Sequence, residues 1–165
     1  MPRTMTVSDN VVVAADPQTV WRLVADPSQM PRWSPENVSG DVPAPGTPLG
    51  VGEEFVGGNR RGRARWHTRC RVTASEPGRR FTFDVLQIGV RSPLVPVRIA
   101  TWDYAFEPAV GGTLVTETWT DGRRGWPDAV ANAFDRVATG GRTFADFQRR
   151  NIARTLKNLK VDLES

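Results

Sequence analysis

The chain has 165 residues, of which 39% are hydrophobic and 24% are charged. These fractions exclude a wholly disordered, collagen-like or coiled-coil protein, and the length leads us to expect a single domain over residues 1–165. The net charge of +4, with arginine at 20 of the 22 basic positions, permits contact with nucleic acid or anionic lipid without indicating either.

No segment of the sequence is typical of a membrane-spanning helix. The longest purely apolar run extends from Val11 to Ala15, whereas a spanning helix needs about 20 apolar residues. The first residues also lack the pattern of a secretory signal. The single cysteine, Cys70, has no partner for an intrachain disulfide. We therefore expect a soluble, cytoplasmic protein.

The first forty residues predict one strand followed by two short helices. Residues 5–14 are rich in valine and predict the strand. Asp16 and Pro17 are typical of a helix start, because an N-cap aspartate accepts hydrogen bonds from free backbone N–H groups and proline has no N–H to leave unpaired. A second Asp-Pro pair predicts another helix around residues 28–33. The prolines and glycines of residues 41–52 predict a loop.

The middle of the chain predicts antiparallel strands with one buried face. Between residues 64 and 73 the even positions carry apolar or small residues, namely Trp66, Thr68, Cys70 and Val72. This alternation is typical of a strand with one face in a core. Aromatic residues alternate again in three further strands, around residues 81–85, 98–107 and 113–120. We expect the pair Gly57-Gly58 to mark a bulge or bend.

The end of the chain predicts a long amphipathic helix. Hydrophobic residues recur at steps of three to five between residues 144 and 163, and most of the arginines and lysines lie elsewhere around the helix. Residues 127–138 predict a turn or two of helix before it, ended by Gly140-Gly141. The order of elements predicts an α+β fold with the long helix on one face of a curved antiparallel sheet.

Two groups of residues resemble one known superfamily. The segment from Ala15 to Pro27, which is followed by Arg32-Trp33-Ser34-Pro35, resembles the opening of START-like (SRPBCC) proteins. More narrowly, it is similar to bacterial polyketide cyclase/dehydrase-type proteins. The second group resembles an actinobacterial branch of these proteins and consists of Gly52, Phe55, Gly58-Asn59-Arg60, Gly62, Trp66, Cys70, Val72, Pro77-Gly78, Phe81 and Phe83.

The resemblance covers nearly the whole chain and implies a helix-grip fold, in which an antiparallel sheet wraps around a long C-terminal helix. Relatives of this kind hold lipids, polyketides, hormones or other apolar molecules in a cavity between sheet and helix, and some are aromatases or cyclases. The matching positions are mainly structural. The resemblance therefore implies a pocket and carries over no catalytic residue.

Inward-facing rings of the predicted strands and helix are candidates for the wall of this cavity. In a small domain such rings normally fill the core, whereas a strongly curved sheet leaves a space that rings line. Polar residues on the flank of the helix would orient a ligand. The candidates for the cavity wall are Trp66, Cys70, Phe81, Phe83, Trp102, Tyr104, Phe106, Trp119, Phe144, Phe147, Gln148, Asn151, Ile152 and Thr155.

Glu117 is the candidate catalytic residue, because it shares a predicted strand face with Val115 and Trp119. If the side chain points inward, burial raises its pKa and suits it to proton transfer or to binding a hydroxyl. The alternative is a salt bridge to one of the arginines. Asp103 has the opposite parity from its aromatic neighbours and is predicted to point outward.

Other chemistries have less support in the sequence. His67, the only histidine, falls on the predicted outer face and is not expected to be catalytic. Cys70 is interpreted as a small hydrophobic residue. The motifs of a serine-hydrolase nucleophile, a P-loop and a dinucleotide site are missing. With one histidine and one cysteine, we predict no metal and no cofactor.

Eight arginines lie within 21 residues, and several of them would share the outer face of paired strands. This arginine stripe consists of Arg60, Arg61, Arg63, Arg65, Arg69, Arg71, Arg79 and Arg80. The simplest interpretation is a solvated sheet face; the functional one is a surface that docks on an anionic membrane or an acidic protein. We expect no nucleic-acid binding, because rings that would stack on bases fall on the opposite face.

These observations favour a protein that binds a small hydrophobic molecule, lipid-like or polyketide-like, in an internal cavity as a carrier or binding protein. The first alternative is a cofactor-independent polyketide cyclase, aromatase or dehydratase acting in the same cavity, with Glu117, Tyr104 and Asn151 as its candidate acids and bases. The second alternative is an interaction module that uses the arginine stripe. The sequence names no ligand and sets no oligomeric state.

Overall fold

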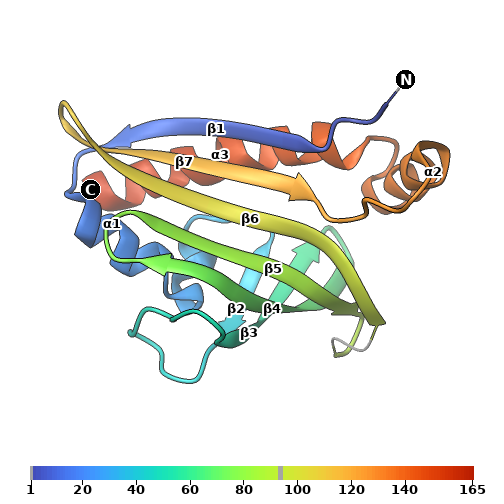
Figure 1. Ribbon diagram of the computed structural model, residues 1–165, viewed down its shortest axis with the longest axis horizontal. Helices are drawn as coiled ribbons and strands as arrows, with labels where there is room; N and C mark the ends of the chain where they lie inside the picture. The colour runs from blue at the N-terminus through green and yellow to red at the C-terminus, as the bar shows by residue number, and fades with distance from the viewer. Residues whose placement is uncertain (1, 93–94) are drawn as a thin grey trace.

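The computed structural model describes residues 2–92 and 95–165, which form one seven-stranded antiparallel sheet and four helical segments (Figure 1). The order of the strands across the sheet is β1-β7-β6-β5-β4-β3-β2. In chain order the elements are β1 (Thr6–Val13), α1 (Pro17–Val24), the 3-10 helix η1 (Pro27–Arg32), β2 (Asn37–Asp41), β3 (Glu54–Arg61), β4 (Ala64–Glu76), β5 (Arg80–Gly89), β6 (Val95–Ala109), β7 (Gly112–Asp121), α2 (Asp128–Thr139) and α3 (Phe144–Glu164).

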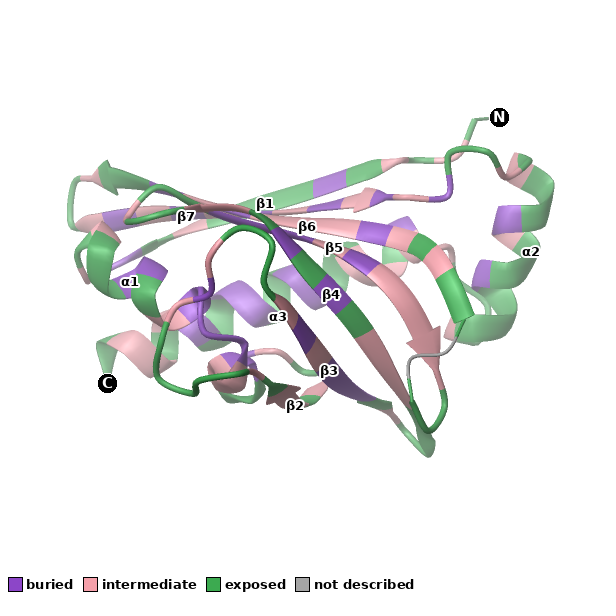
Figure 2. Cartoon of the chain, turned by 60° about the horizontal axis from the view of Figure 1, so that its bottom comes forward, coloured by how far each residue is buried: buried purple, intermediate pink, exposed green. Residues whose placement is uncertain are grey.

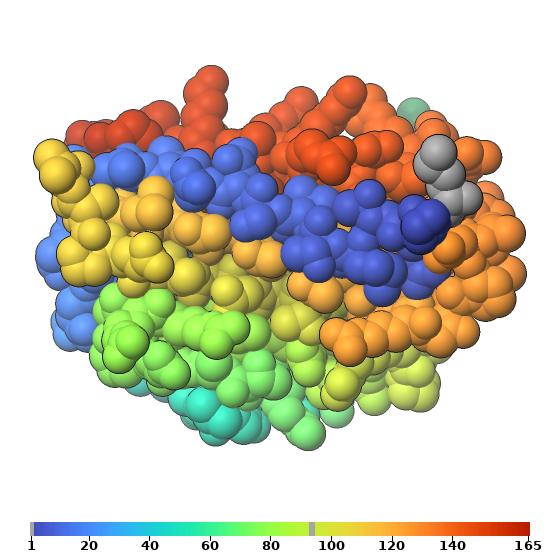
Figure 3. Space-filling view, turned by 45° about the horizontal axis from the view of Figure 1, so that its top comes forward, coloured from blue at the N-terminus to red at the C-terminus, as the bar shows by residue number. Residues whose placement is uncertain are grey.

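The sheet curves around α3, which confirms the predicted α+β helix-grip arrangement. The helix packs mainly against β1 and β7 and also touches η1. Figure 3 shows the β1 edge of the sheet lying along α3. The strands from β6 to β3 curl away from this contact, and the ribbon of β3 turns back below the helix (Figure 2). The inner faces of the central strands therefore point toward α3 without packing directly on it.

The two short helices begin where the Asp-Pro pairs predicted. Asp16 caps α1 by accepting a hydrogen bond from the Thr19 backbone N–H at 3.0 Å. Asp26 caps η1 in the same way, accepting from the Ser28 N–H at 3.1 Å. The second segment is a 3-10 helix rather than an α-helix. Pro31 lies inside it and, having no N–H, cannot donate the hydrogen bond that an α-helix would need there.

The predicted alternation along the strands is confirmed. On β4, Cys70 and Val72 are buried and the arginines on either side of them are exposed; on β7, buried residues alternate with half-buried ones along the whole strand. Figure 2 shows this as a change of colour from residue to residue. The inward-facing side chains form one hydrophobic core, to which α1 adds Val20, Trp21 and Val24.

Three features differ from the sequence prediction. Residues 37–41 form strand β2, which was not predicted, and α2 has 12 residues rather than a turn or two. The pair Gly57-Gly58 stays in regular register with β4, and the irregularity lies instead on β2, between Asn37 and Ser39. At Gly58 the Ser39 side chain of β2 lies close, since a Cβ there would lie 2.3 Å from Ser39 Oγ.

Within the described residues, no helix combines the length and hydrophobicity needed to cross a membrane.

Candidate ligand cavity

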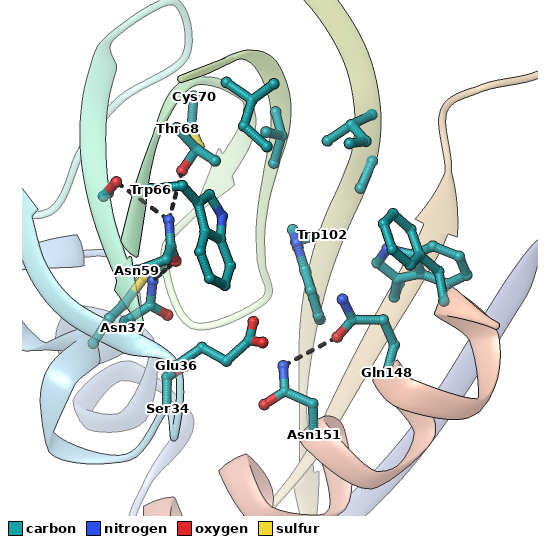
Figure 4. A pocket seen from close by; sticks show the side chains of 18 of the residues that line it. Ser34, Glu36, Asn37, Asn59, Trp66, Thr68, Cys70, Trp102, Gln148 and Asn151 are labelled. Carbon is teal, nitrogen blue, oxygen red and sulfur yellow. Dashed lines mark hydrogen bonds between the residues drawn. The ribbon is translucent and has the colours of Figure 1, made fainter. Parts of the chain in front are cut away.

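A cavity of about 260 Å³ lies between the concave face of the sheet and α3 (Figure 4). Pockets for small molecules commonly measure about 300–1,000 Å³, so this one lies near the lower limit. Its wall combines rings and aliphatic side chains with a few polar groups, and consists of Met30, Ser34, Glu36, Asn37, Phe55, Gly57, Asn59, Arg61, Ala64, Trp66, Thr68, Cys70, Phe83, Val85, Ile88, Ile99, Ala100, Trp102, Tyr104, Glu117, Trp119, Phe134, Ala138, Phe144, Gln148, Asn151 and Thr155.

The register of the sheet explains which side chains reach this space. Alternate residues of β3 from Phe55 to Arg61 face the cavity, and each lies opposite a lining residue of β4, from Cys70 to Ala64. Side chains of a strand point alternately to its two faces, so one inward residue fixes the orientation of the rest of the strand. The same rule brings Ala100, Trp102 and Tyr104 of β6 to the wall.

Most residues predicted for the cavity wall lie on it, and four lie elsewhere. The structure places Trp66, Cys70, Phe83, Trp102, Tyr104, Trp119, Phe144, Gln148, Asn151 and Thr155 on the wall, together with Glu117. Phe81, Phe106 and Ile152 are fully buried in the core without lining the cavity. Phe147 packs against the guanidinium of Arg61, with 3.7 Å between the ring centroid and the Arg61 Cζ atom.

Glu117 is buried within the cavity wall, with 2% of the residue exposed. Its Oε1 atom accepts a hydrogen bond from the Tyr104 hydroxyl at 2.8 Å, and its Oε2 atom has no hydrogen-bond partner among the described residues. Burial raises the pKa of Glu117 to about 8; the Tyr104 hydrogen bond opposes this rise and the charge of Asp9 adds to it. The carboxyl group is therefore mainly protonated at pH 7. The alternative of a salt bridge to an arginine is wrong for the part of the chain described.

Tyr104 shares this environment. Burial raises the pKa of its hydroxyl well above the ordinary value, and the neighbouring Glu117 raises it further. The phenol is consequently protonated throughout the neutral range and acts as a donor to Glu117. The two residues come from neighbouring strands, at directly opposed positions of β6 and β7.

The cavity opens at one end, where its lining residues are exposed or half-buried. We call this end the mouth and define it by Arg61, Ala64, Phe134 and Ala138. Arg61 forms an ion pair with Glu36, with 2.9 Å between Nε and Oε1, and donates a second hydrogen bond to the Ala138 carbonyl at 2.9 Å. Arg61 thereby links β3 to the C-terminal end of α2 across the mouth.

This placement corrects the prediction for one member of the arginine stripe. Arg61 faces the cavity and not the outer surface, because it has the same parity on β3 as Phe55. Burial raises the pKa of its partner Glu36, and the charge of Arg61 offsets part of that rise. The other seven arginines are exposed. Arg71 pairs with Glu54 and Arg80 pairs with Asp103, each at 2.7 Å. A docking role for the stripe stays a prediction.

Replacing Arg61 with alanine is expected to loosen the end of α2 without unfolding the protein. The change removes a charged hydrogen bond to the Ala138 carbonyl, which for a partly exposed group contributes on the order of 1 kcal/mol. Amide hydrogen exchange over residues 134–139 should become about fivefold faster. The matched control is Arg63→Ala in the exposed turn between β3 and β4. Equal exchange in both variants would mean that Arg61 does not hold the mouth.

Amide side chains make up most of the remaining polar wall. Asn37 donates to Asn59 at 2.9 Å, and Asn151 donates to Gln148 at 3.0 Å. Figure 4 shows Asn37 and Asn59 on the sheet side, and Gln148 and Asn151 on α3 across the cavity from them. Each pair leaves further donors and acceptors of its amides available to a polar group on a ligand.

The remaining candidate residues lie on the faces of the sheet that the strand alternation predicted for them. Asp103 points outward and accepts hydrogen bonds from Arg80 and Thr82. His67 lies on the outer face, with Nδ1 3.3 Å from the Val90 carbonyl oxygen. Burial raises the pKa of the Cys70 thiol to about 12, so it is protonated. Among the residues described, no three His, Cys, Asp or Glu side chains are grouped so that they could hold a metal ion.

Several residues of the cavity wall were not predicted from the sequence. Glu36, Asn37 and Asn59 belong to β2, β3 and the segment before them, where no strand alternation was assigned. Phe134 and Ala138 belong to α2, and nothing in the sequence of this helix indicates that it lies at the mouth. For β3 a signal was present, since Phe55 and Asn59 have the same parity and a glycine lies between them.

A family model described as "Polyketide cyclase / dehydrase and lipid transport" matches residues 4–164. The chain belongs to this family. The match covers every strand and helix described above, which agrees with the resemblance found in the sequence. No curated protein matches the chain.

Solved structures share the fold of this polyketide cyclase/dehydrase family member. A protein from Nitrosomonas europaea is similar with a TM-score of 0.67 and 16% identity, over 99% of this chain and 98% of that one. A protein from Mycobacterium smegmatis has a TM-score of 0.65 and 20% identity, over 97% and 91%. A Polyketide_cyc-like protein from Corynebacterium glutamicum has a TM-score of 0.56 and 26% identity, over 99% and 94%.

Proposed function

We propose that this protein, as a single domain, binds a small hydrophobic molecule in the cavity between the sheet and α3, as a carrier or binding protein. The observation that carries the proposal is a largely apolar cavity of about 260 Å³ with polar groups at separate points of its wall. Such a site gains affinity from the apolar area it removes from water and orientation from its polar groups. The family description includes lipid transport, which supports this class of ligand.

The volume of the cavity favours a compact ligand. Because it lies near the lower limit for small-molecule pockets, one or two fused rings or a short acyl chain fit better than a long-chain lipid. Rings would pack against the indoles of Trp66 and Trp102, which Figure 4 places on the sheet side of the cavity.

The direct test is native mass spectrometry of the protein purified from its own host, followed by denaturation and identification of the released compound. A stoichiometric apolar compound is the expected result. A bare mass calls for a second measurement with added fatty acids and aromatic polyketides. If the mass is unchanged there as well, the proposal fails.

Filling the cavity from the sheet is expected to abolish binding. Ala100 lies on the inward face of β6 and is 4% exposed, so Ala100→Leu places a larger side chain in the cavity. We expect at least tenfold weaker binding of tetralin, a bicyclic hydrocarbon, by isothermal titration calorimetry. Overpacking costs about 1–3 kcal/mol, which a folded domain of this size tolerates. The matched control is Ala105→Leu on the opposite face of the same strand; equal losses in both variants would contradict cavity binding.

A second candidate function, a cofactor-independent polyketide cyclase, aromatase or dehydratase, is favoured by one observation. Glu117 is a buried acid in the cavity wall, and its Oε2 atom has no partner among the described residues. A positioned carboxylic acid can protonate a carbonyl oxygen in a reacting chain. Turnover of a bound polyketide by the wild type distinguishes the two functions, because a carrier releases the compound unchanged. If turnover is found, Glu117→Gln should abolish it and keep binding.

A further inference from the structure

We propose that Glu117, held by Tyr104, is an uncharged hydrogen-bond donor that selects ligands carrying a carbonyl or another neutral oxygen acceptor. The inference rests on the proposed function, because it specifies which hydrophobic molecules the cavity takes. Hydrocarbons, carboxylates and amines of the same size are predicted to bind less well. Two properties of Glu117 would produce this preference, namely the carboxyl oxygen that carries the proton and the charges that surround it.

The hydrogen bonding of Glu117 places its proton on the carboxyl oxygen that has no partner among the described residues. The Tyr104 hydroxyl donates to Oε1 at 2.8 Å, so Oε1 acts as the carbonyl oxygen of the acid. The hydroxyl is then at Oε2, which has no partner among the described residues although it is buried. A buried polar group without a partner is unfavourable. A ligand acceptor at this position would remove that penalty.

The charges around Glu117 disfavour its ionised form. β1 presents Asp9 at the position paired with Glu117, and β6 presents Tyr104, so both neighbouring strands contribute an acidic group or a phenol. Across the cavity, the lining residues of α3 are uncharged, with Gln148, Asn151 and Thr155 on the wall. The one ion pair of the described wall lies at the mouth, between Glu36 and Arg61. These two charges neutralise each other.

These surroundings discriminate between ligand classes. A carboxylate would bring a second acid to a site where no described arginine or lysine reaches Glu117. An ammonium group would have to give up its hydration for a neutral partner. A ketone accepts the Oε2–H bond without any change of charge. A site built around a buried donor commonly discriminates against analogues that leave it unpaired.

The test compares four bicyclic probes by isothermal titration calorimetry at pH 7: tetralin, 1-tetralone, 1-naphthoate and 2-aminotetralin. We expect 1-tetralone to bind at least tenfold more tightly than tetralin, and the two charged probes to bind more weakly than the ketone. Raising the pH to 9.5 should remove the advantage of the ketone, because Glu117 then ionises. The affinity for tetralin should change less than twofold.

Substitutions separate the donor from the shape of the pocket. Glu117→Gln keeps an acceptor for Tyr104 and puts an amide N–H in place of the Oε2–H, so the preference for the ketone should persist at pH 7 and become independent of pH. Glu117→Leu should bind tetralin and 1-tetralone alike. Glu107→Gln, an exposed change on β6, is the control and should behave as wild type. If the leucine variant does not fold, the glutamine variant and the pH series still test whether Glu117 is a neutral donor.

Each contrary result has a distinct meaning. Equal affinity of the wild type for tetralin and 1-tetralone overturns the inference and leaves cavity binding intact. Tightest binding of 2-aminotetralin, lost in Glu117→Gln, overturns it too, because the carboxyl would then serve as an ionised counter-charge. Failure of both tetralin and 1-tetralone to bind overturns this inference. The proposed function fails with it if the native mass is also unchanged with added fatty acids and aromatic polyketides.

Discussion

Replacing Arg123 with methionine is expected to lower the free energy of unfolding by about 3–5 kcal/mol, the usual result of breaking a buried ion pair. The guanidinium is fully buried, and it donates to Asp121 Oδ1 at 2.9 Å and to Asp135 Oδ1 at 2.7 Å. Burial alone would raise the pKa of Asp121, but the hydrogen bonds and charge of Arg123 hold it below its ordinary value. Methionine fills much of the space and leaves the carboxylates without this partner.

The position of Arg123 explains why the effect should extend beyond one ion pair. Asp121 ends β7 and Asp135 lies in the middle of α2. Asp135 Oδ2 also accepts a hydrogen bond from the Phe144 backbone N–H at 2.9 Å, at the first residue of α3. The guanidinium lies over the Phe144 ring, with 4.5 Å from Cζ to the ring centroid. Arg123 thus joins the end of the sheet, α2 and the start of α3.

Urea unfolding measures the Arg123→Met effect directly, and a thermal scan should show a fall in Tm of roughly 6–20 °C for a chain of this size. The matched control is Arg124→Met, since Arg124 is the next residue and is exposed; its free energy of unfolding should change by less than about 0.5 kcal/mol. A loss below about 1 kcal/mol for Arg123→Met would contradict the assigned role.

The second large effect is on the pH dependence of stability, and it comes from Glu117. Its pKa is about 8 in the folded protein, against a reference value of 4.5 for the unfolded chain. Between these two values the folded state holds a proton that the unfolded chain releases. The free energy of unfolding therefore falls as the pH rises through this window, by about 1.4 kcal/mol for each unit. The stabilising contribution is complete below pH 4.5 and lost above pH 8.

Glu117→Gln should remove this dependence, because the amide does not titrate. We expect the wild-type free energy of unfolding to decrease by about 4 kcal/mol more than that of the variant between pH 5 and pH 9. Urea unfolding at several pH values measures the difference, and Glu107→Gln is again the control. Groups that titrate in both proteins cancel in the comparison. Parallel curves for wild type and Glu117→Gln would mean that the carboxyl is not held neutral.

The orientation of the central strands was predictable from the sequence because their alternation is regular. Trp66 and Cys70 on β4, and Trp102 and Tyr104 on β6, needed only parity to be placed on the inner face. Parity does not say how far along the strand the cavity extends. Phe81 lies on the inner face of β5, but it is near the first residue of the strand, close to α1. Trp21 Nε1 of α1 donates a hydrogen bond to the Arg80 carbonyl there. Phe81 is therefore a core residue and not a wall residue.

The parts that were not predicted depend on contacts between distant segments. Strand β2 has a polar sequence, and it pairs with β3 from a position next to η1. Arg61 would be assigned to solvent by its charge, yet Glu36 and the end of α2 give it partners inside the mouth. Neither the pairing of β2 nor the partners of Arg61 are determined by neighbouring residues in the sequence. The pairing of Glu36 with Arg61 requires the segment before β2 to lie beside β3. The periodicity of a helix or a strand carries no information about such a contact.

The separation of the mouth from Glu117 has a consequence for the rates of ligand exchange. Arg61 and α2 border the open end of the cavity, so we expect the contacts of Arg61 with Glu36 and Ala138 to contribute to the barrier for ligand entry and exit. Glu117 contributes only to the bound state. Changes at the mouth should therefore alter association and dissociation together and leave Kd nearly constant, whereas changes at Glu117 act mainly on dissociation. The residence time of a ligand therefore depends on the mouth as well as on Glu117, whereas its affinity depends mainly on Glu117. A protein of this design can retain its ligand for longer than the affinity alone would give.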